Sequence, residues 1–331
     1  MGFNVSVDFK NLGGFPAQGH VIPDQGMQPA NAGPATGGGQ NRTYEDGYNW
    51  VNAGGNPEGS TTYWGYDNRA SQYNEAAATL TLHSTSSDAT ASSNDRDDNP
   101  SLGFEITYNL ELSRSESWRW GLEGAFGYMN VSVHDSRTLS ANATRISDTF
   151  QFPFDPETGG PVTPPLSSSY SGPYTPALEG TPFLGDSPSR QTQILPGGAA
   201  ITGQRSFDAN VFGFRFGPYL DIPLSESVML TFSGGLALAQ VASDFSYHET
   251  VTLADIGSVS RSGSGSHADL QVGYYAAGNV AVALNEDRSW QLFGGVQFQD
   301  LGHYEHKLDG KAAVLDLGQA IFVALGVSYS F

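Results

Sequence analysis

Apolar and polar residues alternate along eight segments of the chain with a period of two, the period of a β-strand. One face of each segment carries Phe, Leu, Ile, Val, Trp or Tyr, and none of these faces carries Asp, Glu, Lys or Arg. The pattern therefore predicts eight β-strands with one charge-free face each. They cover residues 3–9, 102–112, 118–128, 212–222, 228–238, 270–284, 290–298 and 319–331.

The opposite faces of these segments are small or polar and include charged residues. A soluble sandwich would tolerate charge on its solvated face, whereas a lipid-facing charge costs ~2–4 kcal/mol at the bilayer midplane. We therefore expect an all-β fold, a transmembrane antiparallel up-and-down β-barrel of eight strands. Such a barrel is just wide enough to be filled by side chains, so charges in its lumen must pair. The expected lumen salt-bridge network comprises Asp8, Lys10, Glu105, Glu111, Arg119, Glu123, Arg215 and Asp221.

Short and long connections alternate along the chain. Three short polar turns cover residues 113–117, 223–227 and 285–289, and Trp118 and Trp290 follow two of them as candidates for an interfacial girdle. Short turns are typical of the periplasmic side and long loops of the extracellular side. We expect one barrel domain over residues 1–331, with both termini periplasmic and extracellular insertions at about 11–100 and 134–204. The second insertion holds ten of the 18 prolines and is expected to be irregular.

A ten-strand barrel is the alternative. Residues 42–52 and 78–88 would then supply two more strands. Residues 42–52 lack a clean apolar face, which favours eight strands. Aromatic residues are dense at 42–50 and 63–66, and they could instead form a small packed cap or a plug.

The last segment alternates up to a terminal aromatic residue, with Tyr329 and Phe331 on its apolar face. It resembles the C-terminal signature of bacterial outer-membrane β-barrels, whose last strand is recognised by the barrel-insertion machinery. The aromatic stretches at 42–50 and 63–66 and the Trp-Arg-Trp-Gly sequence at 118–121 resemble a family of predicted outer-membrane barrels without assigned activity, and the architecture resembles that of small OmpA/OmpX-like barrels. The resemblance implies the outer membrane of a Gram-negative bacterium, with its lipid and the insertion machinery as partners. The first residues show no signal peptide, so we presume that an export signal has been removed.

The amino-acid composition excludes several classes of partner and of functional site. The chain has 15 Lys+Arg against 34 Asp+Glu, a formal net charge of −19, which argues against a nucleic-acid partner because phosphate binding needs a basic patch. The absence of Cys excludes disulfides, a Cys-based zinc site and a thiol nucleophile. Only 15% of residues are charged, against roughly a quarter in soluble domains.

No motif predicts catalysis, a cofactor or a metal. His303 and His306 flank a glutamate, but in a strand they would point to opposite faces. The oxygen-rich run at 94–99 suits calcium yet lacks the glycine and distal glutamate of an EF-hand. No nucleophile elbow occurs, and the glycine runs lack the lysine that follows in a phosphate-binding loop. Four other histidines lie at or beyond the outer ends of predicted strands and are weaker candidates for metal ligands: His83, His134, His248 and His267.

We therefore expect a non-enzymatic outer-membrane barrel with a structural or surface-interaction role, a closed polar lumen and acidic extracellular loops that contact other surface molecules. A small pore or transporter is the first alternative, and it needs more strands or a looser lumen network. An outer-membrane enzyme is the second, and it needs a Ser/His/acid set converging on the rim. A soluble β protein is the third.

Overall fold

A computed structural model gives the fold and describes residues 2–3, 6–20, 41–50, 59–96, 101–153, 159–160, 164–172, 182–285 and 289–329. Within these ranges lie twenty-one strands and one helix, α1 (Arg69–Gln72). No helix in this part of the chain has the length and hydropathy to cross a membrane. Parts of the segments considered above lie outside the described ranges, namely residues 4–5, 51–52, 97–99, 286–288 and 330–331, which include Phe331.

The largest sheet has eleven strands, and its main path runs β1-β10-β11-β15-β16-β17-β18-β21 with every neighbouring pair antiparallel. This confirms the predicted all-β, antiparallel class. Each of the seven segments predicted from residue 102 onward lies in its own strand of this path. The bounds are β1 (Gly2–Phe3), β10 (Ser101–Arg114), β11 (Arg119–Asp135), β15 (Ser189–Pro223), β16 (Val228–Leu253), β17 (Gly257–Ala283), β18 (Trp290–Asp300) and β21 (Ala320–Tyr329).

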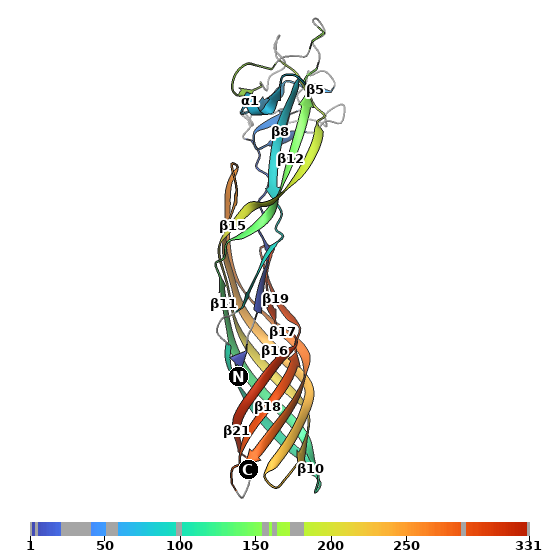
Figure 1. Cartoon of the computed structure of the whole chain (residues 1–331), viewed down its shortest axis with the longest axis vertical. Helices are drawn as coiled ribbons and strands as arrows, with labels where there is room; N and C mark the ends of the chain where they lie inside the picture. The colour runs from blue at the N-terminus through green and yellow to red at the C-terminus, as the bar shows by residue number, and fades with distance from the viewer. Residues whose placement is uncertain are drawn as a thin grey trace.

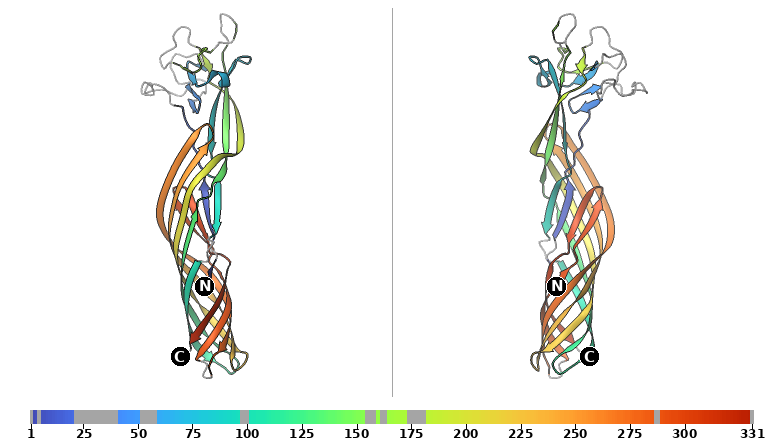
Figure 2. Two further views of the ribbon diagram at one scale, coloured as in Figure 1. Left: turned by 60° about the vertical axis from the view of Figure 1, so that its left-hand side comes forward. Right: turned by 90° about the vertical axis from the view of Figure 1, so that its right-hand side faces the viewer.

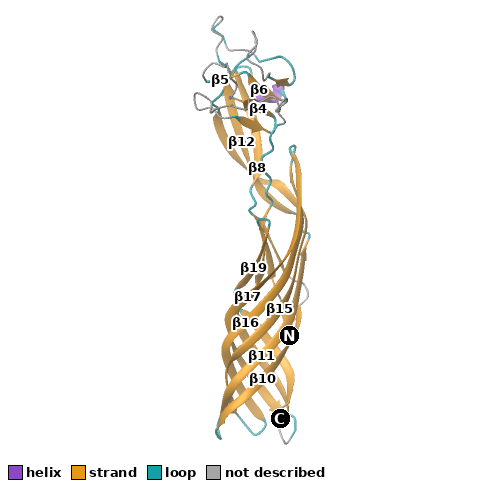
Figure 3. Ribbon diagram, turned by 180° about the vertical axis from the view of Figure 1, so that it is seen from behind, coloured by secondary structure: helices purple, strands orange, loops and turns teal. Residues whose placement is uncertain are grey.

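The molecule is elongated along its strands (Figure 1). Strands β15, β16 and β17 have 35, 26 and 27 residues, about three times the ~9–11 residues of a membrane-crossing strand. We call the part around the end of β21 the lower section. It consists of β10, β18 and β21 together with residues 119–129 of β11, 211–223 of β15, 228–240 of β16 and 270–283 of β17. Its strands lean around a common axis (Figure 3), and the N-terminus lies part-way up the molecule (Figure 2).

The predicted closed barrel is not found. Among the described residues β1 is paired with β10 and β21 with β18, but no pairing joins β1 or β10 to β21. The strand predicted over residues 3–9 is also divided, because β1 ends at Phe3 and β2 (Ser6–Leu12) belongs to a second sheet.

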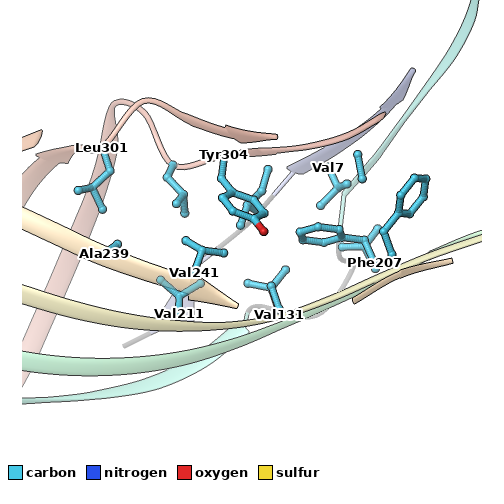
Figure 4. Packing of buried hydrophobic residues seen from close by; sticks show 14 of the residues in the cluster. Val7, Val131, Phe207, Val211, Ala239, Val241, Leu301 and Tyr304 are labelled. Atoms are coloured by element: carbon cyan, nitrogen blue, oxygen red, sulfur yellow. The ribbon is translucent and has the colours of Figure 1, made fainter. Parts of the chain in front are cut away.

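That second sheet has the order β19-β20-β2-β9 and forms the upper section together with residues 130–135, 199–210, 241–253 and 257–269 of the long strands. Its other strands are β9 (Ala91–Arg96), β19 (His303–Leu308) and β20 (Lys311–Asp316). The interior between these strands is a hydrophobic core (Figure 4), in which Tyr304 and Leu301 point toward Val211, Ala239 and Val241. Apolar side chains therefore fill most of the interior of the upper section, and the core reaches into the top of the lower section at Val211 and Ala239.

A distal module lies beyond the upper section (Figure 1). The strand β8 (Thr79–Ser87) pairs with β12 (Leu139–Gln151) and with β7 (Tyr73–Asn74), and β12 pairs with the start of β15. Above them lie two small sheets, β13-β6-β4-β3 and β14-β5, around a core that includes Trp64, Leu82 and Phe150. The strands of these sheets are β3 (Arg42–Tyr44), β4 (Gly47–Trp50), β5 (Ser60–Thr61), β6 (Tyr63–Tyr66), β13 (Tyr170–Ser171) and β14 (Leu184–Gly185).

Two expectations about the insertions are corrected here. Residues 139–151 and 189–204 form strands instead of irregular loop, because nine of the ten prolines lie between residues 153 and 188 and the tenth, Pro196, sits at a shift in register. Gly197 next to it has φ +66°, which a glycine adopts without strain. The ten-strand alternative also fails, because residues 42–50 and 79–87 form strands of the distal module and not of the lower section.

Candidate functional site: an apolar band and the charges inside it

The outward face of the lower section is a continuous band of exposed apolar residues without charge, which we call the apolar band. Ile106 on β10 is 66% exposed, Val272 on β17 62% and Leu325 on β21 80%. In water such a surface would be unfavourable, because monomers rarely expose large contiguous apolar patches. Its exposed members include Phe104, Ile106, Tyr108, Leu110, Leu112, Phe214, Phe216, Phe232, Leu236, Leu270, Val272, Val280, Val282, Leu292, Val296, Ile321, Val323, Leu325 and Val327.

Aromatic residues mark both ends of the apolar band. At the turn end Trp118, Trp120 and Trp290 are exposed, and the Trp290 ring lies 5.0 Å from that of Tyr329. At the other end the ring of Tyr128 lies 5.3 Å from that of Phe212. Rings with one apolar side and one polar edge suit a boundary between water and hydrocarbon.

The two faces of the long strands exchange polarity at the upper edge of this band. On β15 the outward residues are apolar from Ile222 to Phe212 and polar from Asn210 upward, while the inward residues change from Arg215 and Gly213 to Val211 and Phe207. Side chains in a strand alternate with a fixed period of two, so β15 keeps its orientation throughout. The exchange therefore records a change in what surrounds the strand.

The exchange occurs at one level in four neighbouring strands. Tyr128, the last apolar outward residue of β11, is in register with Phe212 of β15, which is in register with Gln240 of β16 and this in turn with Leu270 of β17. On β16 the last apolar outward residue is Leu238, two residues below this level. Above that level the outward faces carry Asn, Asp, Ser, Thr, Gln and His. The exchange therefore falls within two residues of one register level in four neighbouring strands, which indicates a common boundary across the sheet.

Strands β18 and β19, which pair with β21 and β20, cross the boundary in another way: the apolar residues continue, but the strand changes which set of residues faces inward. Below it the even residues of β18 face outward, and above it the even residues Tyr304 and His306 of β19 are buried. The change of phase falls at Leu301 and Gly302, where the Leu301 N–H donates to the Leu317 carbonyl (3.2 Å) and Gly302 has φ +71°. Here a one-residue shift turns apolar side chains from the outside to the core.

The strand predicted over residues 3–9 has the opposite orientation from the predicted one, because its apolar face is turned toward the upper core. Val7 and Phe9 were expected on the outer, lipid-facing side, but both are fully buried in the upper core. Asp8 and Lys10 lie on the other face of β2, where Asp8 accepts a hydrogen bond from the Asn94 side chain and Lys10 is exposed. These two residues are therefore separate from the other six of the expected network.

Those six residues form ion pairs on the inward face of the lower section, where Glu123, Arg215 and Asp221 are buried and Glu111 is exposed. Arg215 donates to Glu105 through two nitrogens and to Glu123 at 3.3 Å, and its guanidinium lies over the Tyr275 ring at 4.6 Å. Arg119 lies 2.9 Å from Asp221 and 4.0 Å from Glu111. Glu123 also accepts hydrogen bonds from Ser233 (3.1 Å) and Tyr275 (3.2 Å), which the sequence argument did not identify. Both partners could have been found from the alternation, because Ser233 on β16 and Tyr275 on β17 belong to the inward-facing set of residues.

Two buried ion pairs of the upper section were not predicted from the sequence. Lys311 donates to Glu249 at 2.7 Å, and Arg205 donates to Asp135 at 3.0 Å, with the Arg205 and Asp135 side chains fully buried. Burial alone would raise the pKa of Asp135, but hydrogen bonds from Ser93 and Arg137 lower it to about 2. Each pair neutralises a charge that would otherwise be buried alone.

No protein-family model, no curated protein and no solved structure matches this chain.

Metal binding finds no support in the part of the chain that the structure describes, where no group of three or more His, Asp or Glu side chains converges. His303 and His306 point to opposite faces of β19, as the sequence predicted, with His303 exposed and His306 buried. His306 Nδ1 lies 2.8 Å from Ser243 Oγ, and its ring is 5.6 Å from that of His267. Of the oxygen-rich run at 94–99, residues 97–99 lie outside the described ranges.

We predict that Arg215→Met lowers the free energy of unfolding in detergent by about 3–5 kcal/mol, because it leaves Glu105 and Glu123 without their cation. The matched control is Arg114→Met, which removes an exposed pair with Glu111 and should lower it by less than about 1 kcal/mol. Urea unfolding followed by circular dichroism measures both. Equal losses in the two variants would contradict a buried interior network.

We also predict a pH dependence from His306. Burial, and then the neighbouring His267, lower the pKa of His306, while Asp244 opposes them. Because the unfolded chain takes up a proton that the folded chain resists, the free energy of unfolding should fall as the pH falls below about 6.5, by at most about 1.4 kcal/mol per pH unit.

Unfolding of His306→Gln between pH 7 and 5 should show a shallower slope than the wild type. His303→Gln, which changes the exposed histidine of the same strand, is the control and should retain the wild-type slope. A wild-type slope in His306→Gln would contradict the assignment.

Proposed function

We propose that this protein is an integral outer-membrane β-barrel that anchors a rigid stalk and holds the distal module away from the membrane surface. The observation that carries the proposal is the exchange of polarity between the two strand faces at one shared level. A bilayer explains it directly, since hydrocarbon requires an apolar exterior below that level and water permits a polar exterior above it.

The orientation follows from the connections. The lower section ends in short turns between β10 and β11, β15 and β16, and β17 and β18. Short turns are typical of the periplasmic side, so the upper section and the distal module would lie outside the cell. The aromatic residue Tyr329 at the end of β21 would serve in recognition by the insertion machinery, together with Phe331.

A structural or surface-interaction role fits this arrangement. The distal module is built around aromatic residues, and the ring centroid of Trp64 lies 4.5 Å from that of Tyr170 and 5.3 Å from that of Phe152. It is held by the β8 and β12 extension of the main sheet, far from the apolar band (Figure 1). A module in that position would meet other surface molecules before the rest of the protein does.

A pore is the second candidate, and its support is the polar interior of the lower section. The interior of the upper section argues against it, because Val241, Phe245 and Tyr304 are fully buried there together with the Lys311–Glu249 pair. An ion leaving the lower section would have to pass through this core, which has the composition of a soluble protein interior.

The first test places a charge on each side of the proposed boundary. Val272→Arg and Ser264→Arg both change an exposed outward residue of β17, one inside the apolar band and one above it. We predict that Val272→Arg destabilises the folded protein in lipid by about 2–4 kcal/mol, while Ser264→Arg changes it by less than about 0.5 kcal/mol.

Refolding into vesicles, flotation and the heat-dependent gel shift of the folded form measure this difference. The wild type should float with the vesicles. A wild type that stays soluble without lipid or detergent, or an equal effect of the two substitutions, would contradict membrane insertion at this band.

The second test is conductance. We predict that planar bilayers containing the refolded wild type stay electrically silent, because the upper core blocks the interior. Flotation of the same preparation serves as the control for insertion. Steady single-channel steps from floated protein would favour the pore.

A further inference from the structure

The upper section has two neighbouring sheet edges on one side. Above Tyr274, which pairs with Asp300 of β18, strand β17 pairs with β16 alone among the described strands, and β19 likewise pairs with β20 alone. The two edges lie close together, because the Tyr304 hydroxyl donates to the His267 carbonyl at 3.0 Å. The two sheets enclose the core between them (Figure 4), so β17 ends one layer and β19 ends the other.

Two side chains of the β17 edge are exposed although they belong to the inward-facing set. His267 and Asp269 are in register with Ser243 and Val241 of β16, and both of these β16 residues are buried. Directly opposed residues share a face of the sheet, so all four side chains point toward the interior. His267 and Asp269 are nevertheless exposed. The interior of the upper section is therefore uncovered along this edge.

The β17 edge is also open to pairing with another strand. Natural edges are often kept from further pairing by lysine, by proline or by a bulge. Residues 262–268 contain no Lys, Arg, Pro, Asp or Glu, and the pairing of β17 with β16 runs without a shift in register. An exposed, regular and uncharged edge of this kind is a template for a further strand.

The directions of the two edge strands determine which strand can be added. Strand β17 runs down toward the lower section, and β19 continues the upward course of β18 (Figure 1). Copies in one membrane share one orientation, so β17 beside β17 would be parallel. By contrast, β17 beside β19 would be antiparallel, as are the other pairs of both sheets. This inference rests on the proposed membrane location, which fixes the orientation of the copies.

A two-fold axis along the membrane normal brings these edges together. A rotation of 180° about such an axis, placed beside the two edges, exchanges the two layers of the sandwich. Strand β17, which ends one layer, then meets β19 of the other copy, which ends the other layer. The contact is isologous, so it closes after two copies and covers both edges of each. We propose that the protein forms a dimer in which β17 of each copy pairs with β19 of the other.

The register of this pairing follows from the height of the residues. Rotation about the membrane normal leaves heights unchanged, so residues at one level in a single copy are opposite each other in the dimer. A Cβ added to Gly265 would lie 3.1 Å from Leu308 Cδ1, which places these two residues at one level. In antiparallel register Ser266 is then opposite Lys307. Both are exposed and face outward, so the register also agrees with the alternation of the two strands.

The charges at this level are complementary. Asp208 and Asp244 are directly opposite each other on the outward faces of β15 and β16, and like charges in that position repel. Asp244 is in register with Ser266, so Lys307 of the second copy comes next in the same row. Within one copy the Lys307 side chain is 73% exposed and lies 3.0 Å from Glu305, an arrangement that contributes little in water. In the dimer Lys307 would place a cation beside two carboxylates.

The absence of Cys allows a direct test by disulfide trapping between copies. Ser266→Cys and Lys307→Cys are made in separate chains, which are then refolded together into the same vesicles. Opposed residues of antiparallel strands lie about 4.5–5.5 Å apart at Cα, within the reach of a disulfide. Each variant alone is one control, because the two Ser266 residues of the dimer lie on opposite faces. Ser262→Cys mixed with Lys307→Cys is the matched control, about 13 Å further along the same face of β17.

The second measurement is the dissociation constant of the dimer, obtained without cysteines by sedimentation in density-matched detergent. Lys307→Glu should weaken the dimer by at least about tenfold, because it opposes Asp244 with a like charge. The double variant Lys307→Glu with Asp244→Lys should recover most of this loss. The control is Lys10→Glu, which makes the same change at an exposed position of β2.

The expected result is a covalent dimer from the mixture of Ser266→Cys and Lys307→Cys, and little from the single variants or from the Ser262→Cys mixture. Absence of a covalent dimer, equal trapping at Ser262 and Ser266, or equal effects of Lys307→Glu and Lys10→Glu would overturn this inference. Flotation separates the two proposals. A chain that floats as a monomer contradicts only the dimer, whereas a chain that does not float contradicts the proposed function and with it this inference.

Discussion

The structure depends on one constraint: side chains in a β-strand alternate with a period of two, and a strand cannot change which set faces inward without a local shift. Strands β11, β15, β16 and β17 cross from the lower to the upper section without such a shift, so their residue types change instead. The hairpin of β18 to β21 keeps its apolar parity and shifts phase at Leu301 and Gly302. The change of residue type and the phase shift have the same result: apolar side chains face outward in the lower section and inward in the upper section.

The same constraint explains why the interior is charged below and apolar above. In the lower section the outward positions hold the apolar residues, so the inward positions are left for Arg119, Glu123 and Arg215, which must pair to be buried. In the upper section the outward positions are solvated and the apolar residues move inside. The buried pair of Lys311 and Glu249 shows that charge is still admitted there, provided that its partner is in reach.

The sequence predicted the seven strands from residue 102 onward because each has a charge-free face, which is a strong signal. It predicted the wrong orientation for Val7 and Phe9, because alternation identifies an apolar face without stating whether lipid or a core covers it. The upper halves of β15 to β17 were not predicted, because their outward faces are polar and the inward face of β17 is interrupted by Gly263 and Gly265, so the alternation of apolar residues is weak there. The ion pairs of Arg215 could be predicted from the alternation, because its partners lie on the same inward face. The place of Asp8, which accepts a hydrogen bond from Asn94 in the second sheet, depends on the division between β1 and β2, and no local residue signals that division.

The long ladder of β15, β16 and β17 has a mechanical consequence. Its hydrogen bonds lie perpendicular to the strands, and the strands run along the length of the molecule, so tension between the distal module and the lower section would shear many bonds at once instead of opening them one after another. A load applied to the module would be shared by the whole ladder. A ladder of this length would therefore resist extension, and force applied at one end of the molecule would reach the other with little change in the distance between them.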